Sequence, residues 1–152
     1  MISLADIRKE ITTKLKNQFD NTKVFFDNVE NADEAYFYIE FTPKAKTIDD
    51  IYTEHVIKVD IDYVLPEDNN GKIDRRKLYD SVQKIDVLFR PVLKVKDRAF
   101  TVLETSTNIH DDILHFTFEL DFVDCLDDEE ISNIKYELMQ ILELDWEENK
   151  NE

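Results

Sequence analysis

Hydrophobic residues recur at helical spacing in three segments of the chain. Residues 4–19 carry them three and four positions apart, which predicts an amphipathic helix with Ser3 as N-cap and Asp6 at the capping-box position. A second helix is predicted after the capping residue Asp74, and Pro91 ends it. The core stripes of the two helices are Leu4, Ile7, Ile11, Leu15 and Phe19 in the first, and Leu78, Val82, Ile85 and Phe89 in the second.

A third helix is predicted in the last part of the chain. It begins near Asp127 or Asp128 and runs to about Leu144. The acids in its first turn suit the positive end of the helix dipole. Its apolar face consists of Ile131, Ile134, Leu138, Ile141 and Leu142.

Alternating apolar and polar residues indicate the strands. Residues 55–63 alternate most cleanly, with apolar side chains at odd positions from 57 and with Lys58, Asp60 and Asp62 between them. Residues 113–122 repeat the pattern, with Phe116, Phe118, Leu120 and Phe122 on one face. Shorter strands are expected at 23–28, 35–42 and 100–103, with 105–112 as a connection. One buried and one wet face is typical of an antiparallel sheet.

The predicted fold is therefore α+β, with the order α-β-β-β-α-β-β-α. It has a mostly antiparallel or mixed sheet, with three amphipathic helices to cover its apolar face. Residues 1–152 are expected to form one domain, since this length is usual for one, and residues 145–152 an acidic tail. A chain this long buries about 68–70% of its unfolded surface and needs no disulfide or metal. The expected buried sheet residues are Ile57, Val59, Ile61, Phe116, Phe118 and Leu120.

Charge narrows the classes of partner. Nineteen Lys and Arg face 35 Asp and Glu, a net charge of -16, which repels nucleic acid phosphates and anionic membranes. Residues 127–152 hold ten acids and two lysines, a net charge of -8. No apolar run approaches the roughly 18 residues of a membrane span, and no secretory signal is visible.

Glycine and cysteine counts exclude further chemistry. Gly71 is the only glycine, whereas a P-loop or a dinucleotide fingerprint needs at least two, so both are excluded. Cys125 is the only cysteine, so it cannot form an internal disulfide. With no histidine nearby in sequence, we expect Cys125 to be a small buried hydrophobe rather than a nucleophile.

Three polar clusters raise the question of an active or metal site. His110, Asp111, Asp112 and His115 are metal-ligand types and would suit a small hydrolase, but they straddle a predicted turn. Asp60 and Asp62 share a strand face and could hold a cation, although Lys58 on that face favours an exposed polar face. Residues 67–71 resemble a calcium loop only faintly. We therefore predict no catalytic, metal or cofactor site.

The charge distribution instead predicts protein interfaces. Basic residues gather only in the middle of the chain, where an acidic protein surface is a better partner than nucleic acid. Acids open the last predicted helix. The interface candidates are Arg75, Arg76, Lys77, Arg90, Lys94, Lys96 and Arg98 on the basic side, and Asp128, Glu129 and Glu130 on the acidic side.

Two segments, MISLADIRKEITTKLKNQF at 1–19 and YELMQILELDWEE at 136–148, together resemble the phage tail terminator family of prophages of Gram-positive bacteria. The first segment is similar to the start of these proteins, and the second resembles their terminal pattern. The matching positions there are Met139, Leu142, Glu143 and Leu144. The element order between the ends also fits, so the resemblance covers essentially the whole chain.

The resemblance implies a phage structural protein, neither an enzyme nor dependent on a cofactor. It implies a homo-oligomeric ring, commonly a hexamer, at the head-proximal neck end of the virion tail, assembled in the host cytoplasm. Its partners would be itself, the tail tube protein and head-completion or neck proteins, with no specific nucleic acid and no membrane. A ring also needs two unlike surfaces, which the basic and acidic candidates could supply. The alternative is a monomeric acidic adaptor or inhibitor, such as a nucleic-acid mimic that binds a basic surface.

Overall fold

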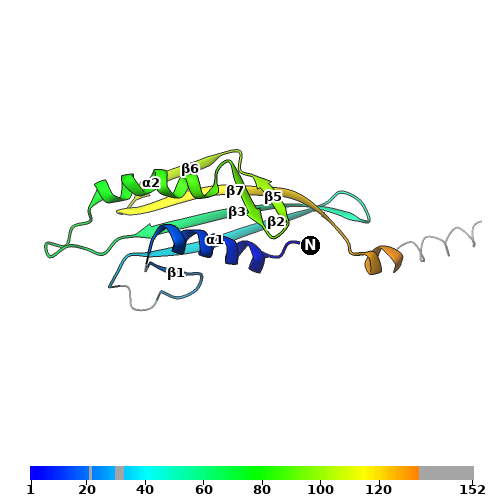
Figure 1. Cartoon of the computed structure of the whole chain (residues 1–152), viewed down its shortest axis with the longest axis horizontal. Coiled ribbons are helices and arrows are strands. Elements are labelled where there is room, and N and C mark those ends of the chain that lie inside the picture. Colours follow the sequence, from blue (N-terminus) through cyan, green and yellow to red (C-terminus); the bar gives the residue numbers. More distant parts are fainter. Residues whose placement is uncertain (21, 30–32, 134–152) are drawn as a thin grey trace, which may run out of the picture.

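The structure is a computed structural model, and it describes residues 1–20, 22–29 and 33–133 (Figure 1). The elements before the second helix are α1 (Leu4–Gln18), β1 (Lys23–Phe25), β2 (Tyr36–Thr47) and β3 (Tyr52–Val64). They are followed by α2 (Arg75–Phe89), β4 (Val92–Val95), β5 (Arg98–Thr101), β6 (Thr105–His110) and β7 (Ile113–Cys125). Residues 128–133 begin a further helix. The predicted α+β class is confirmed.

One mixed sheet forms the centre of the fold. Its five strands stand in the order β1-β2-β3-β7-β6. All neighbours are antiparallel except β1 and β2, which are parallel. The central pair joins β3 to β7, with Val59 opposite Phe118 and Ile61 opposite Phe116. Strands β4 and β5 form a separate antiparallel hairpin.

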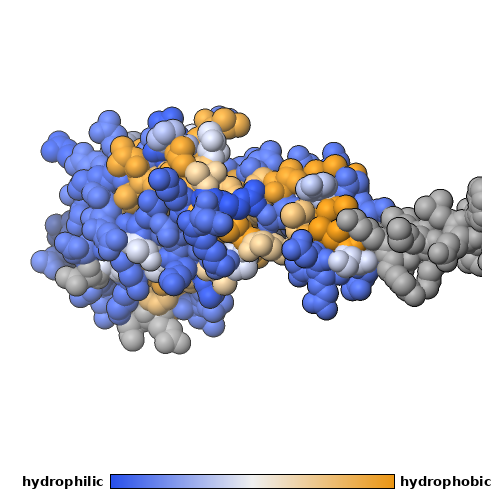
Figure 2. Space-filling view, turned by 45° about the vertical axis from the view of Figure 1, so that its right-hand side comes forward, coloured by the Kyte–Doolittle hydropathy of each residue, from blue (hydrophilic) through white to orange (hydrophobic). Residues whose placement is uncertain are grey.

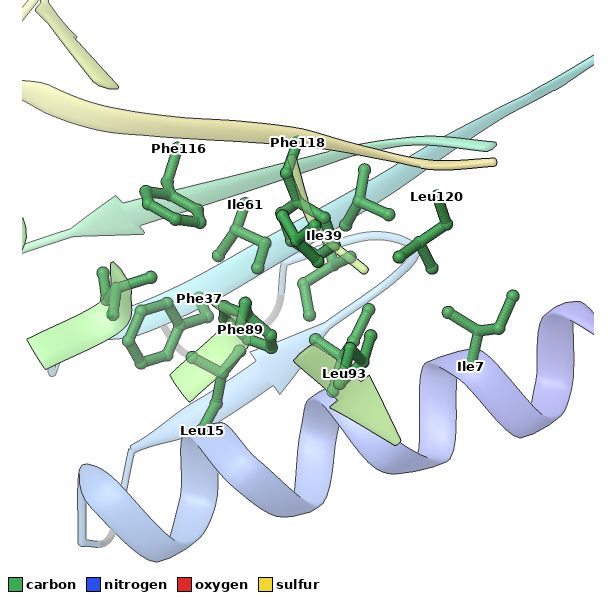
Figure 3. Close-up of a cluster of buried hydrophobic side chains, with 14 of the residues drawn as sticks. Ile7, Leu15, Phe37, Ile39, Ile61, Phe89, Leu93, Phe116, Phe118 and Leu120 are labelled. Atoms are coloured by element: carbon green, nitrogen blue, oxygen red, sulfur yellow. The ribbon is translucent and has the colours of Figure 1, made fainter. Parts of the chain in front are cut away.

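The period of two along β3 and β7 separates a buried from a wet sheet face. Helices α1 and α2 lie on the same side of the sheet (Figure 1), and the side chains between them pack into one cluster (Figure 3). Phe89 of α2 stacks on Phe118 with 5.1 Å between ring centroids. The six expected sheet residues are all buried: Ile57, Val59, Ile61, Phe116, Phe118 and Leu120. We call the opposite face, which carries Lys58, Asp60 and Asp62, the open face.

Local capping sets where the helices begin. Ser3 and Asp6 form the predicted capping box of α1, and the Asp74 carboxylate accepts hydrogen bonds from the first-turn amides of α2. Most of the predicted stripe residues are buried. Phe19 and Val82 are half-buried, and 41% of Leu4 is exposed, because it borders a groove beside β2 that no other described element fills.

Two strands were not anticipated from the sequence. β6 occupies part of the expected connection, because Asp111 and Asp112 adopt positive φ angles of 51° and 58° and reverse the chain in two residues. Its sequence is polar because most of its side chains are exposed at the sheet edge. β4 was not predicted because it has only four residues, too few for a clear alternation, and it follows directly after the end of α2.

The β2–β3 hairpin and β7 extend past both helices as an arm (Figure 1). Beyond β7, the predicted helix start is confirmed, because Asp127 and Glu130 cap each other's backbone amides at 2.9 and 3.1 Å. Three expectations lie outside the described residues: the rest of this helix to about 144, the terminal motif and the acidic tail.

Candidate protein interaction surfaces

The basic interface candidates form two separate groups. Arg75, Arg76 and Lys77 open α2, whereas the other four follow its end. A helix of 15 residues is about 22 Å long, so the two groups do not form one patch. The acidic candidates Asp128, Glu129 and Glu130 lie in the first turn of the last helix, at the opposite end of the molecule from the start of α2 (Figure 1).

Four of the seven basic residues bind acids of the same chain. The Arg75 guanidinium lies 3.2 Å from Asp112, and hydrogen bonding to Tyr79, followed by the charge of Asp112, raises the pKa of Arg75. Arg90 forks onto Asp86 at 2.7–3.0 Å. This contact, with a hydrogen bond from Thr105, lowers the pKa of Asp86 despite its partial burial.

Lys96 and Arg98 connect the β4–β5 hairpin to other elements. The Lys96 ammonium lies 2.9 Å from Asp6. Hydrogen bonds from Ser3 and from Lys96 lower the pKa of Asp6 to about 2. Arg98 binds the buried carboxylate of Asp124 and donates to the Val123 carbonyl at 3.1 Å.

Arg98 and Asp124 together fix the base of the arm. The Arg98 guanidinium lies over the rings of Phe100 and Phe122, 5.4 and 5.3 Å from their centroids. Asp124 also accepts a hydrogen bond from the Ile2 amide at 3.2 Å, which holds the start of the chain against β7. These contacts give Arg98 a role inside the fold that sequence reasoning did not find.

Arg76, Lys77 and Lys94 remain exposed. Within the described part of the chain, none of the three forms an ion pair. They are therefore the basic candidates whose charge is most available to another molecule.

The histidine–aspartate cluster is divided between a turn and the sheet. Asp111 and Asp112 are the turn itself, and Asp112 faces Arg75. His115 lies on the open face with its Nδ1 atom 2.5 Å from Asp62 of β3. No group of three metal-ligand side chains converges anywhere in the described residues. The cluster therefore consists of a hairpin turn and a cross-strand pair.

The remaining polar positions also have local partners. Asp60 accepts a hydrogen bond from Thr117 at 2.9 Å across the open face. Asp68 accepts from the Asn70 and Lys72 amides at 2.8 and 2.9 Å, an Asx turn completed by Gly71 at a φ of 70°. The prediction of a buried Cys125 is wrong: Cys125 is exposed, because even-numbered residues of β7 face the core and Cys125 falls on the open face.

Within the described residues, none of the helices has the length and apolarity required to cross a membrane. The surface is largely hydrophilic, with apolar patches on the body and on the narrower arm (Figure 2). These features define a small α+β protein with an acidic surface, a two-helix cover and an open sheet face.

The particular family follows from comparison with known proteins. The model of a family described as phage tail terminator protein matches residues 6–132, so the chain belongs to that family. The family is a structural one of the phage tail, and the match confirms the family that the resemblance suggested. The match includes most of the opening segment and ends before the terminal motif at 136–148. A search of curated proteins finds no match to the chain.

Proposed function

We propose that the chain forms a homo-oligomeric ring, of six copies, on the head-proximal end of the tail tube. The ring stops tube polymerisation and presents a surface to head-completion proteins. Family membership across residues 6–132 carries this proposal. The shape supports it, because the two ends of the elongated molecule differ, as the two faces of a ring between tube and head must.

We assign protein contacts to the charged candidates in the same proposal. The start of α2 and the start of the last helix lie at opposite ends of the molecule, so in the ring they lie on opposite faces and contact different partners, the tail tube and a head-completion protein. Charge complementarity with such a partner speeds association and fixes orientation, and salt screens it beyond roughly 8 Å. Arg76 and Lys77 contribute through their free charges. Arg75, Arg90, Lys96 and Arg98 contribute less, because their charges are balanced within the fold.

The test is tail length, measured by electron microscopy. A strain lacking the protein should produce tubes that grow past the normal length. The double variant Arg76→Glu and Lys77→Glu should do the same while the protein stays folded, because both side chains are exposed. Lys9→Glu with Lys16→Glu is the matched control, since it makes the same charge change on the exposed side of α1.

Two outcomes separate the parts of the proposal. Tails of normal length in the deletion strain contradict the terminator role and favour an acidic adaptor. Long tails in the deletion strain but normal tails in the Arg76 and Lys77 variant keep the role and remove these two residues from the interface.

A further inference from the structure

The sheet leaves part of each edge unpaired. β1 pairs only with the first residues of β2, Tyr36 to Tyr38, so residues 39–47 of β2 have no described strand beside them on that side. β6 pairs with β7 from Ile113 to Phe118, so residues 119–125 have none on the other side. Both stretches lie toward the arm end of the sheet (Figure 1).

A groove follows each unpaired edge. The groove beside β7 has a volume of about 320 Å³ and includes Glu119, Asp121 and Leu103 in its walls. Leu103 is 87% exposed and is the most exposed large apolar residue in the described part of the chain. The groove beside β2 has a volume of about 470 Å³. Its apolar walls are Leu4, Ala5, Phe26, Ile39 and Phe41.

The two edges run in the same direction. Both β2 and β7 are antiparallel to β3, so they are parallel to each other. The register also aligns their side chains: Lys44 and Asp121 both stand opposite Val56, and Thr42 and Glu119 both stand opposite Lys58. Lys44 and Asp121 therefore lie in one row across the open face.

Each edge repels its own kind. Two β2 edges would bring Lys44 and Lys46 against lysines, and Pro43 lacks a backbone donor. Two β7 edges would bring Glu119 and Asp121 against acids. A β7 edge beside a β2 edge in the aligned register instead pairs Asp121 with Lys44 and Glu119 with the neutral Thr42. The favoured contact is thus between unlike edges, which is the kind that closes rings.

We propose that the unpaired edge of β7 in one copy pairs with the unpaired edge of β2 in the next copy of this chain. The pairing rests on the proposed ring. Rotation about a ring axis that runs along the strands keeps the strand direction, so β7 of one copy and β2 of the next pair in parallel. Asp121 then lies beside Lys44 of the neighbour, and Leu103 enters the neighbour's groove at Phe26 and Phe41. The ladder spans residues 119–122, since the Val123 carbonyl already accepts from Arg98.

Crosslinking tests this contact directly. The full-length chain first receives Cys125→Ser, which removes its own thiol. Lys44→Cys and Asp121→Cys are then introduced, and a short bis-maleimide is added both to the purified protein and to isolated tails. We expect a ladder of crosslinked multimers that ends at the ring size. Lys9→Cys with Asp121→Cys, which places the first thiol on α1, should yield no ladder. Absence of the ladder from both preparations overturns the proposal.

A charge swap provides the second measurement. Lys44→Glu or Asp121→Lys alone should weaken association on the order of tenfold, since like charges then meet. Both changes in one chain should restore it, because every copy presents both edges. Leu103→Ala should lower ring yield without changing the melting temperature, since the side chain is exposed.

The outcomes distinguish this contact from the ring itself. If the Lys44 and Asp121 charge variants make tails of normal length, and neither the crosslinked ladder nor the charge-swap rescue is seen, the edge pairing is refuted and the terminator role stays intact. A ladder in purified protein, with normal tails in the deletion strain, supports the edge pairing and removes the terminator role.

Discussion

Phe118→Ala tests the packing of the core most directly. Phe118 is 2% exposed, stands opposite Val59 and stacks on Phe89 at 5.1 Å. Truncating a buried phenylalanine to alanine lowers the free energy of unfolding by about 3–5 kcal/mol, and this figure includes the lost aromatic stacking. For a chain of this size each kcal/mol lowers the melting temperature by about 2–4 °C, so a fall of roughly 6–20 °C is expected. Compared with a total stability of about 5–15 kcal/mol, this loss removes between about a fifth and all of the unfolding free energy.

Urea unfolding followed by circular dichroism measures the loss. Val87→Ala is the matched control, because Val87 lies on α2 with 69% of its surface exposed and should change stability by no more than about 0.5 kcal/mol. The m-value should stay constant in both variants, since the exposed surface on unfolding is nearly unchanged. A loss for Phe118→Ala below about 1 kcal/mol, or equal to that of the control, would show that the phase of β7 is wrong.

Three further predictions concern polar contacts. Asp6→Asn should lower the unfolding free energy at neutral pH, because the Asp6 carboxylate, whose pKa is lowered to about 2, stabilises the fold only while it is ionised. The difference from the unchanged protein should therefore disappear as the pH falls from 3.8 toward about 2. Urea titrations at several pH values measure this difference, and a difference that does not depend on pH contradicts the prediction. Arg98→Lys should cost about 1–3 kcal/mol in thermal unfolding, because lysine cannot serve Asp124 and the Val123 carbonyl together. Calorimetry with added zinc should detect no tight site at His115. Tight zinc binding that disappears in His115→Ala would contradict this prediction.

Periodicity was enough to predict most of the fold. The alternation in β3 and β7 gave the correct buried face because one side of each strand meets α1 or α2 and the other meets water. The capping residues Ser3 and Asp74 located both helix starts for the same local reason. β6 could not be predicted this way, since its side chains are mostly exposed and its place depends on pairing with β7.

The candidate surfaces were harder to predict because charge in sequence does not reveal its partner. Arg98 reads as a surface cation, yet its carboxylate partner lies 26 residues further on. The unpaired edges are equally invisible, because they follow from the difference in length between β1 and β2 and between β6 and β7. A short strand beside a long one is a signal that appears only once the pairing is known.

The central place of β7 has a consequence for how the chain folds. β2 and β3 form a local hairpin, but β3 gains its other neighbour only from residues 114–125, far along the sequence. Such non-local pairing makes folding slow, and β7 leaves the ribosome long after β3. Until then the edge of β3 stays without its partner strand, and an unpaired strand edge favours aggregation of the nascent chain. Docking of β7 covers that edge and at the same step creates the acidic edge at Glu119 and Asp121, so the proposed edge pairing requires a copy whose own core is complete.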